Sequence, residues 1–178
     1  MNTKTTTLSN NKSKPPLWFW IALVSVSLIS LTSVTLNLAK SSRLSIAAQE
    51  NQKPLMTQRV ELLKEEGIIK SNWLKTLNPQ AKKIQGDLIW STKQQKGMMR
   101  FNNLPKLGTD QSYHLWIYDL EYSIKEPISA TRFQTEPQLK KDFLVEITPK
   151  KMIKKPYKFV LVIETKSQEK QILLLAQP

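Results

Sequence analysis

A run of 22 residues without a charged side chain, residues 17–38, constrains this chain more than any other feature. As an α-helix the run is about 33 Å long, which matches the roughly 30 Å hydrocarbon core of a bilayer. A cleaved signal peptide has a shorter apolar core, of about 7 to 15 residues, followed closely by small residues. We therefore predict an uncleaved transmembrane helix over residues 17–39.

The segments on the two sides of this run differ in their capacity to fold. Residues 1–16 are polar and end in two prolines, so they are predicted to be a disordered tail. Lysine and arginine lie on both sides of the run, so the positive-inside rule hardly decides the orientation. The simplest arrangement keeps the short N-terminal segment in the cytoplasm and exports the long C-terminal segment. It predicts a single-pass inner-membrane protein with a cytoplasmic N-terminus and an extracytoplasmic C-terminal domain.

One face of the predicted transmembrane helix carries polar side chains at helical spacings of three and four: Ser27, Ser30, Ser33 and Asn37. Such a stripe could hydrogen-bond to another membrane helix, or could ease unwinding for an intramembrane protease. The alternative is that serine is simply well tolerated in membrane helices. Both interpretations stay open.

Residues 40–67 are predicted to be a partly helical juxtamembrane linker, because few of them are large and apolar. Residues 57–66 have a helical pattern, with Thr57 as a possible N-cap and Gly67 after the end. Residues 68–77 fit helical and strand periods equally, and we favour a strand because strands follow.

Short segments rich in aromatic and branched residues fill the rest of the chain. They comprise residues 86–92, 97–103, 113–122, 129–134, 142–148, 157–165 and 170–176. Their spacing, without a long amphipathic helix between them, predicts an all-β fold. We expect an antiparallel β-sandwich of about seven or eight strands over residues 68–178. Two segments, 113–118 and 159–164, alternate with apolar residues on both faces and are expected to be central strands.

Residue types that carry chemistry are sparse. The chain has no cysteine and one histidine, His114, without a nucleophile motif around it, so neither a catalytic triad nor a zinc site is predicted. Asp119 and Glu121 would share a strand face at a carboxylate-pair distance, but a solvated face is the better interpretation. We predict no enzyme activity, no cofactor and no metal.

The net charge of +13 is spread along the chain, with one local excess. It comprises Lys150, Lys151, Lys154, Lys155 and Lys158. Without interleaved arginines or aromatics this segment favours a solvated loop over a nucleic-acid site. A third interpretation is attraction to anionic lipid headgroups.

An ordered set of motifs over about residues 68–177 resembles the C-terminal, extracytoplasmic domain of the anti-sigma-K factor (RskA-like) family. A strand that contains Trp90 precedes a hairpin and a turn with Leu104 and Pro105. The family's YQLWI-like strand is matched by residues 113–117, with Tyr113, Leu115 and Trp116. Its late FAVTIE-like strand is matched by residues 159–164, from Phe159 to Glu164, and a final apolar strand by residues 173–176.

The resemblance implies a membrane regulator whose outer domain receives a signal and whose cytoplasmic domain holds a sigma factor until proteolysis. The chain departs from the family because its 16 residues before the apolar run contain neither His nor Cys, so the usual N-terminal sigma-binding domain is lacking. Three explanations stay open: a separate partner supplies the cytoplasmic domain, the gene has lost that function, or the true start lies upstream. We favour the first, and expect an anti-sigma-factor-like regulator that acts on a sigma factor through a separate sigma-binding protein, with an intramembrane or site-specific protease as a further partner and no nucleic acid. The alternative is a membrane-tethered structural or adaptor domain of the cell envelope.

Overall fold

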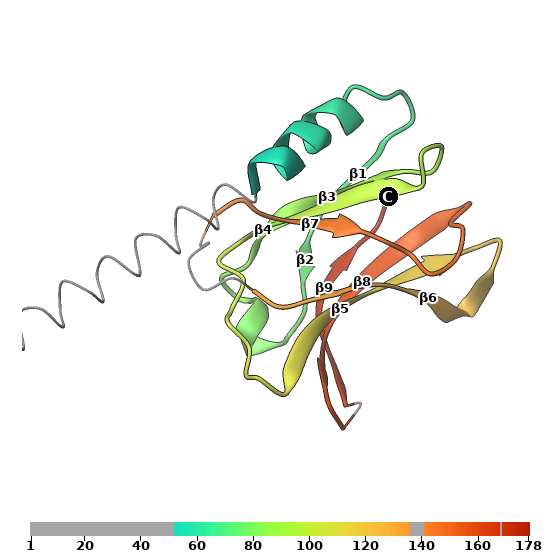
Figure 1. Cartoon of the computed structure of the whole chain (residues 1–178). Helices are drawn as coiled ribbons and strands as arrows, with labels where there is room; N and C mark the ends of the chain where they lie inside the picture. The colour runs from blue at the N-terminus through green and yellow to red at the C-terminus, as the bar shows by residue number, and fades with distance from the viewer. Residues whose placement is uncertain (1–51, 136–140, 168) are drawn as a thin grey trace, which may run out of the picture. The chain divides into compact units, whose positions relative to one another are not determined.

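Two antiparallel sheets packed face to face form the body of the domain that the structure describes (Figure 1). This computed structural model describes residues 52–135, 141–167 and 169–178. One sheet has four strands in the order β1-β3-β4-β7, and the other has five in the order β2-β9-β8-β5-β6. The strands are β1 (Ile69–Asn72), β2 (Leu74–Lys75), β3 (Gln85–Ser91), β4 (Lys96–Asn102), β5 (Gln111–Asp119), β6 (Ser123–Phe133), β7 (Phe143–Ile147), β8 (Pro156–Thr165) and β9 (Lys170–Ala176), with a short 3-10 helix η1 (Pro79–Ala81). The predicted all-β class and antiparallel layers are confirmed.

The predicted tail and transmembrane helix, with the stripe of Ser27, Ser30, Ser33 and Asn37, lie outside the described residues. In the part of the chain that the structure describes, no helix has the length and apolar character needed to cross a bilayer.

The core lies between the sheets and follows from strict alternation along the central strands. In β5, Tyr113, Leu115 and Ile117 are fully buried between the layers. In β8, Phe159 and Leu161 are also fully buried between the layers. The intervening residues face outward, where neighbouring side chains cover most of them, as expected for central strands.

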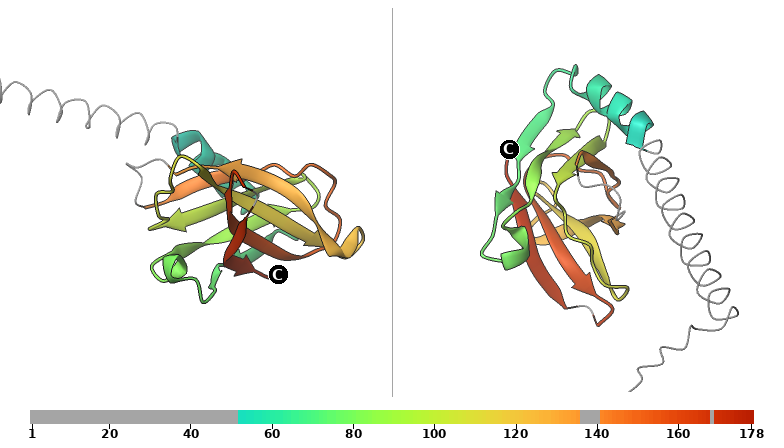
Figure 2. Two further views of the ribbon diagram at one scale, coloured as in Figure 1. Left: turned by 90° about the horizontal axis from the view of Figure 1, so that it is seen from below. Right: turned by 90° about the vertical axis from the view of Figure 1, so that its left-hand side faces the viewer.

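The ambiguous segment, residues 68–77, is extended and passes from one sheet to the other. β1 pairs with β3 in the four-stranded sheet, and β2 pairs with β9 in the five-stranded sheet. Between them Trp73 turns into the core, where its ring stacks on Phe101 at a centroid distance of 5.4 Å. One pair of sheet edges is therefore joined by the chain itself (Figure 2).

The opposite pair of edges, β6 and β7, is joined by hydrogen bonds. The Thr131 hydroxyl donates to the Glu146 carbonyl oxygen at 2.8 Å and accepts from the Thr148 amide at 2.8 Å. The Lys150 amide donates to the Ser129 carbonyl oxygen at 2.9 Å. Strand edges are templates for unwanted pairing, so these bonds leave less edge free.

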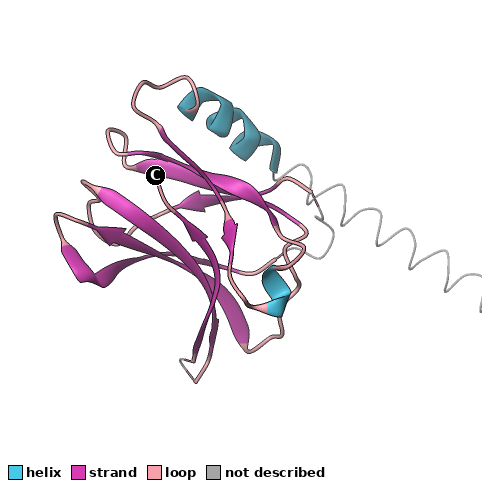
Figure 3. Ribbon diagram, turned by 180° about the vertical axis from the view of Figure 1, so that it is seen from behind, coloured by secondary structure: helices cyan, strands magenta, loops and turns pink. Residues whose placement is uncertain are grey.

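A helix over residues 52–62 covers the outer face of the four-stranded sheet (Figure 3). Leu62 packs on Ile89 and Met98, whose side chains alternate outward from the core. Thr57 lies inside this helix, and its hydroxyl donates to the Lys53 carbonyl oxygen. The prediction that Thr57 caps the helix is therefore wrong, because apolar contact with the sheet extends the helix towards the N-terminus.

Candidate functional site

The outer face of the five-stranded sheet brings four strands together around one buried histidine. His114 of β5 and Glu164 of β8 are only 1 % and 7 % exposed, although both point away from the core. His114 Nδ1 lies 2.9 Å from Glu164 Oε2, and His114 Nε2 lies 2.9 Å from the Ser129 hydroxyl of β6. The three side chains form one hydrogen-bonded chain across β8, β5 and β6.

Two cations complete this network. Arg132 of β6 donates to Glu164 Oε2 at 2.7 Å, and its Nε lies 3.2 Å from His114 Nδ1. Lys170 of β9 lies 3.9 Å from Glu164 Oε1. The antiparallel register explains the grouping, because His114 is opposite Arg132 and Glu164 is opposite Lys170. Glu164 therefore neutralises charge from the neighbouring β9 and from β6, which lies beyond β5 in the sheet.

The protonation states follow from burial and charge. Burial lowers the pKa of His114 below its usual value, and the hydrogen bond to Glu164 offsets this only in part. Burial acts to raise the pKa of Glu164, but the His114 hydrogen bond and the charge of Arg132 outweigh it and lower the pKa. At neutral pH we infer a neutral imidazole beside an ionised Glu164.

A polar cleft of about 480 Å³ opens beside this network. Trp116 forms one wall and is held between two neighbours, with Lys170 Nζ at 4.2 Å from its ring and the His114 ring centroid at 4.2 Å. The remaining lining is mainly polar and comprises Thr109, Asp110, Gln111, Ser112, Arg132, Gln134, Glu164, Thr165, Lys166 and Lys170. A ligand in this cleft would meet cations and amides, with Trp116 as the one large aromatic surface.

Serine hydrolases use the same hydrogen-bonded series of a serine, a histidine and a carboxylate. Here Arg132 shares the carboxylate, and His114 is almost completely covered. The cleft is lined by Glu164 and Arg132 but by neither Ser129 nor His114. A substrate in the cleft would therefore meet the network at its carboxylate end and not at the hydroxyl.

The residues that carry the family resemblance fall into two groups. Most are structural: Trp90, Tyr113, Leu115 and Phe159 are fully buried, Leu104 packs against the core, and the Tyr113 hydroxyl donates to the Pro105 carbonyl oxygen at 2.7 Å. Trp116 and Glu164 differ, since they face outward and line the cleft. Trp116 occupies an outward position of β5 and is half-buried.

Asp119 and Glu121 do not form a pair on one strand face. β5 ends at Asp119, which is 1 % exposed and accepts the amides of Glu121, Lys154 and Lys155 at 2.6 to 2.8 Å. Glu121 lies in the following turn, 3.5 Å from Lys154 Nζ. Asp119 therefore fixes the basic loop and is not available as a catalytic group.

Four lysines of the predicted basic loop, Lys150, Lys151, Lys154 and Lys155, lie in a loop and are exposed. The fifth, Lys158, lies in β8 and is half-buried, so its placement in the loop is corrected. Sequence reasoning missed that the fold brings aromatic rings to them. Lys151 Nζ lies 4.1 Å from the Tyr122 ring, and Lys158 Nζ lies 4.0 Å from the Tyr118 ring. Both tyrosines are far from the lysines in sequence, and the β5–β8 register, which sets Tyr118 opposite Lys158, brings the two segments together.

Searches of protein-family models, of curated proteins and of solved structures found no match to this chain. Among residues 52–135, 141–167 and 169–178, no group of three or more acidic or histidine side chains is arranged to hold a metal ion.

Proposed function

We propose that this protein is a membrane-anchored, anti-sigma-factor-like regulator whose sandwich is an extracytoplasmic interaction module. In this proposal a single helix crosses the inner membrane with the N-terminus in the cytoplasm. The sandwich binds a signal or partner, and a separate sigma-binding protein carries the response to a sigma factor. Proteolysis by an intramembrane or site-specific protease provides the irreversible step.

One observation carries the proposal: the two motif strands are direct neighbours, and their outer face carries the cleft. Residues Tyr113 to Ile117 pair with Ile163 to Phe159 in the centre of the five-stranded sheet. The inner residues of these strands build the core, whereas Trp116 and Glu164 line the cleft. The motifs that resemble the family therefore supply both the scaffold and a polar recognition surface.

Photocrosslinking from the cleft tests this proposal. A photoreactive amino acid replaces Lys166, an exposed cleft residue, in the full-length chain, and a second version carries it at the exposed Lys82. We expect a discrete adduct from position 166 in native membranes and none from position 82. Equal adducts from both positions, or none from either, would contradict a recognition site in the cleft.

The proposal includes no catalytic step by the chain of Ser129, His114 and Glu164. We infer a structural role, in which the neutral imidazole ties three strands together. A fluorophosphonate probe should therefore leave the full-length chain unlabelled. Labelling that disappears in Ser129→Ala would overturn this assignment and would identify a serine nucleophile.

The alternative function is a tethered adaptor of the cell envelope without a link to transcription. The cleft would then bind an envelope component. The identity of the adduct from position 166 separates the two functions, because an adaptor predicts envelope proteins only.

A further inference from the structure

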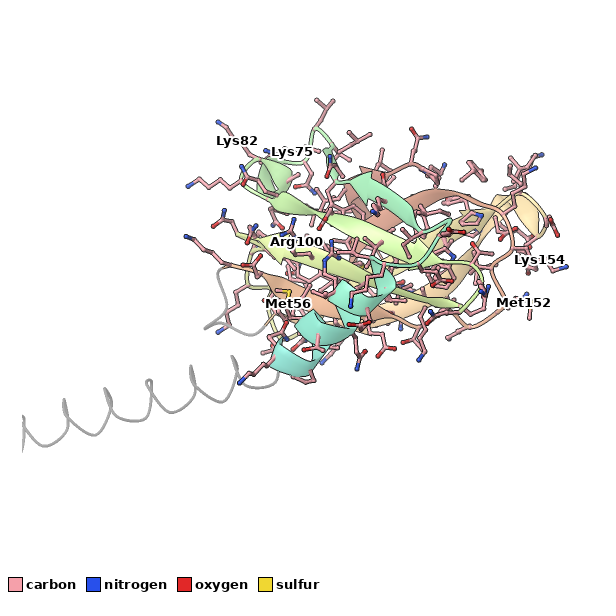
Figure 4. All side chains as sticks on the ribbon, turned by 90° about the horizontal axis from the view of Figure 1, so that it is seen from above. Met56, Lys75, Lys82, Arg100, Met152 and Lys154 are labelled. Carbon is pink, nitrogen blue, oxygen red and sulfur yellow. The ribbon has the colours of Figure 1, made fainter. Side chains whose placement is uncertain are left out.

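One end of the sandwich combines lysines with exposed apolar and tyrosine side chains. Two segments form it: the loop over residues 149–155 and the turn over residues 120–122, together called the lysine tip. Figure 4 shows Met152 and Lys154 at this end and Lys75 and Lys82 at the other end of the domain. From the geometry we propose that the lysine tip docks on the surface of an anionic bilayer.

Hydrogen bonds and a buried side chain hold the loop in one conformation. Its outward side chains therefore keep fixed positions on the surface. Ile153 is fully buried, and its amide and carbonyl are both bound by the Gln95 side chain, at 2.8 and 2.6 Å. Asp119 accepts the next two amides, those of Lys154 and Lys155. These anchors place Met152 on the outside, where it is 68 % exposed. A loop ordered in this way loses little entropy when it binds.

Other exposed apolar side chains lie in the turn over residues 120–122 and at the start of the strand that follows it, and this turn contacts the loop through the Leu120 amide and the Lys155 carbonyl oxygen. Ile124, at the start of β6, is also 68 % exposed, and Leu120 and Tyr122 are each 45 % exposed. Tyrosine is favoured at bilayer interfaces, where its ring contacts acyl chains and its hydroxyl contacts water. The tip therefore offers groups that can enter the headgroup layer.

The charge of the tip is complementary to anionic headgroups. The loop over residues 149–155 contains four lysines and no acidic residue, and Lys125 and Lys158 lie in the adjoining strands. Glu121 is the one acidic residue of the tip, and it lies 3.5 Å from Lys154 Nζ. Each lysine near an anionic surface contributes about fivefold to the binding constant. A nucleic acid would satisfy the lysines equally, but it offers no apolar layer for Met152 and Ile124. The bilayer accounts for both kinds of side chain.

The tip can reach the membrane, provided that the chain is anchored as proposed above. The 12 residues between the predicted membrane helix and residue 52 span at most about 43 Å when extended. The longest strand, β6, has 11 residues and is about 36 Å long. The linker is therefore long enough for the domain to lie with its tip on the bilayer.

A single fluorescent reporter tests the docking in the full-length protein. The chain has no cysteine, so Met152→Cys gives one site for an environment-sensitive dye, and Lys82→Cys gives the matched site at the other end. Both proteins are reconstituted into phosphatidylcholine vesicles with or without phosphatidylglycerol. We expect a blue shift and protection from an aqueous quencher at position 152, only with phosphatidylglycerol, and a loss of both at high salt. Position 82 should not change.

Charge variants supply the quantitative test. Lys150→Gln with Lys155→Gln should lower the ratio of docked to undocked tip about 25-fold, whereas Lys82→Gln with Lys83→Gln should leave it unchanged.

Equal signals at positions 152 and 82, no dependence on anionic lipid, or protection that requires added RNA or an acidic protein would each overturn the proposal. The readout needs no sigma factor, so failure of the docking leaves the regulatory function standing. Removal of the chain from vesicles by an alkaline wash would instead refute the transmembrane anchor. In that case, salt-sensitive flotation of the chain with the vesicles would still report the docking of the tip.

Discussion

The shared carboxylate of Asp87 predicts an asymmetric response to mutation. Asp87 binds Arg59 of the helix at 2.6 Å and Arg100 of β4 at 2.9 Å. The Arg59 side chain is only 6 % exposed, whereas that of Arg100 is 38 % exposed. Burial lowers the pKa of Arg59, and the charge of Asp87 opposes this. The carboxylate is thus the main compensation for a buried cation.

Asp87→Ala should destabilise the fold by about 3 to 5 kcal/mol, because a buried guanidinium loses its counter-ion and faces a second cation. Arg59→Met should cost only about 1 kcal/mol, because Asp87 keeps Arg100 and the new side chain fills the space. Adding Arg59→Met to Asp87→Ala should restore about 1 to 2 kcal/mol.

Urea unfolding of the compact unit Leu44–Pro178, followed by the fluorescence of the buried Trp73 and Trp90, measures these differences. The slopes against urea should agree among the variants, so that the midpoints report stability. Equal costs for the two single variants, or additive costs in the double variant, would refute the electrostatic reasoning and leave only loss of packing.

Three further predictions concern the sandwich itself. Gly86→Ala should cost about 3 kcal/mol in urea unfolding, because a Cβ there would lie 1.9 Å from the Arg100 carbonyl oxygen at a φ of +144°. The pKa of His114 is lowered in the fold, so stability is full above its ordinary pKa of 6.5 and falls below it, by up to about 1.4 kcal/mol per pH unit. The lowered pKa of Glu164 extends this loss below pH 4.5, and His114→Gln should flatten the upper part of the profile. Asp119→Asn should cost about 2 kcal/mol and loosen the basic loop in hydrogen exchange, because an amide group then faces three N–H donors.

Each of these predictions has a clear contrary result. A small cost at Gly86 would mean that the backbone there relaxes freely. A stability profile in which His114→Gln changes nothing between pH 7 and the acid range would remove the histidine as the titrating group. Unchanged exchange of the Lys154 and Lys155 amides in Asp119→Asn would show that other contacts order the loop.

The alternation of apolar residues made the central strands predictable. β8 and β9 were expected within one residue of their observed bounds, because both carry large apolar side chains along their length. β6 was expected from residue 129 but begins at Ser123, since its first half is an exposed edge without that alternation. β5 was expected to continue to residue 122 but ends at Asp119, whose carboxylate caps the turn.

The cleft and the lysine tip could not be predicted because both depend on strand register. His114 and Glu164 are 50 residues apart and meet only because β5 and β8 pair in one register. Shifting that register by one residue would turn Glu164 to the other face. The sequence shows which residues point outward, but not which outward residues become neighbours.

The most direct test of the regulatory function is affinity capture of the full-length protein from crosslinked membranes, with mass spectrometry of the proteins recovered. Our account predicts recovery of a sigma factor or of a short sigma-binding protein, in amounts reduced by a cleft variant that combines Arg132→Ala with Lys170→Ala. Recovery of envelope proteins alone, from both the wild-type chain and that variant, would contradict it.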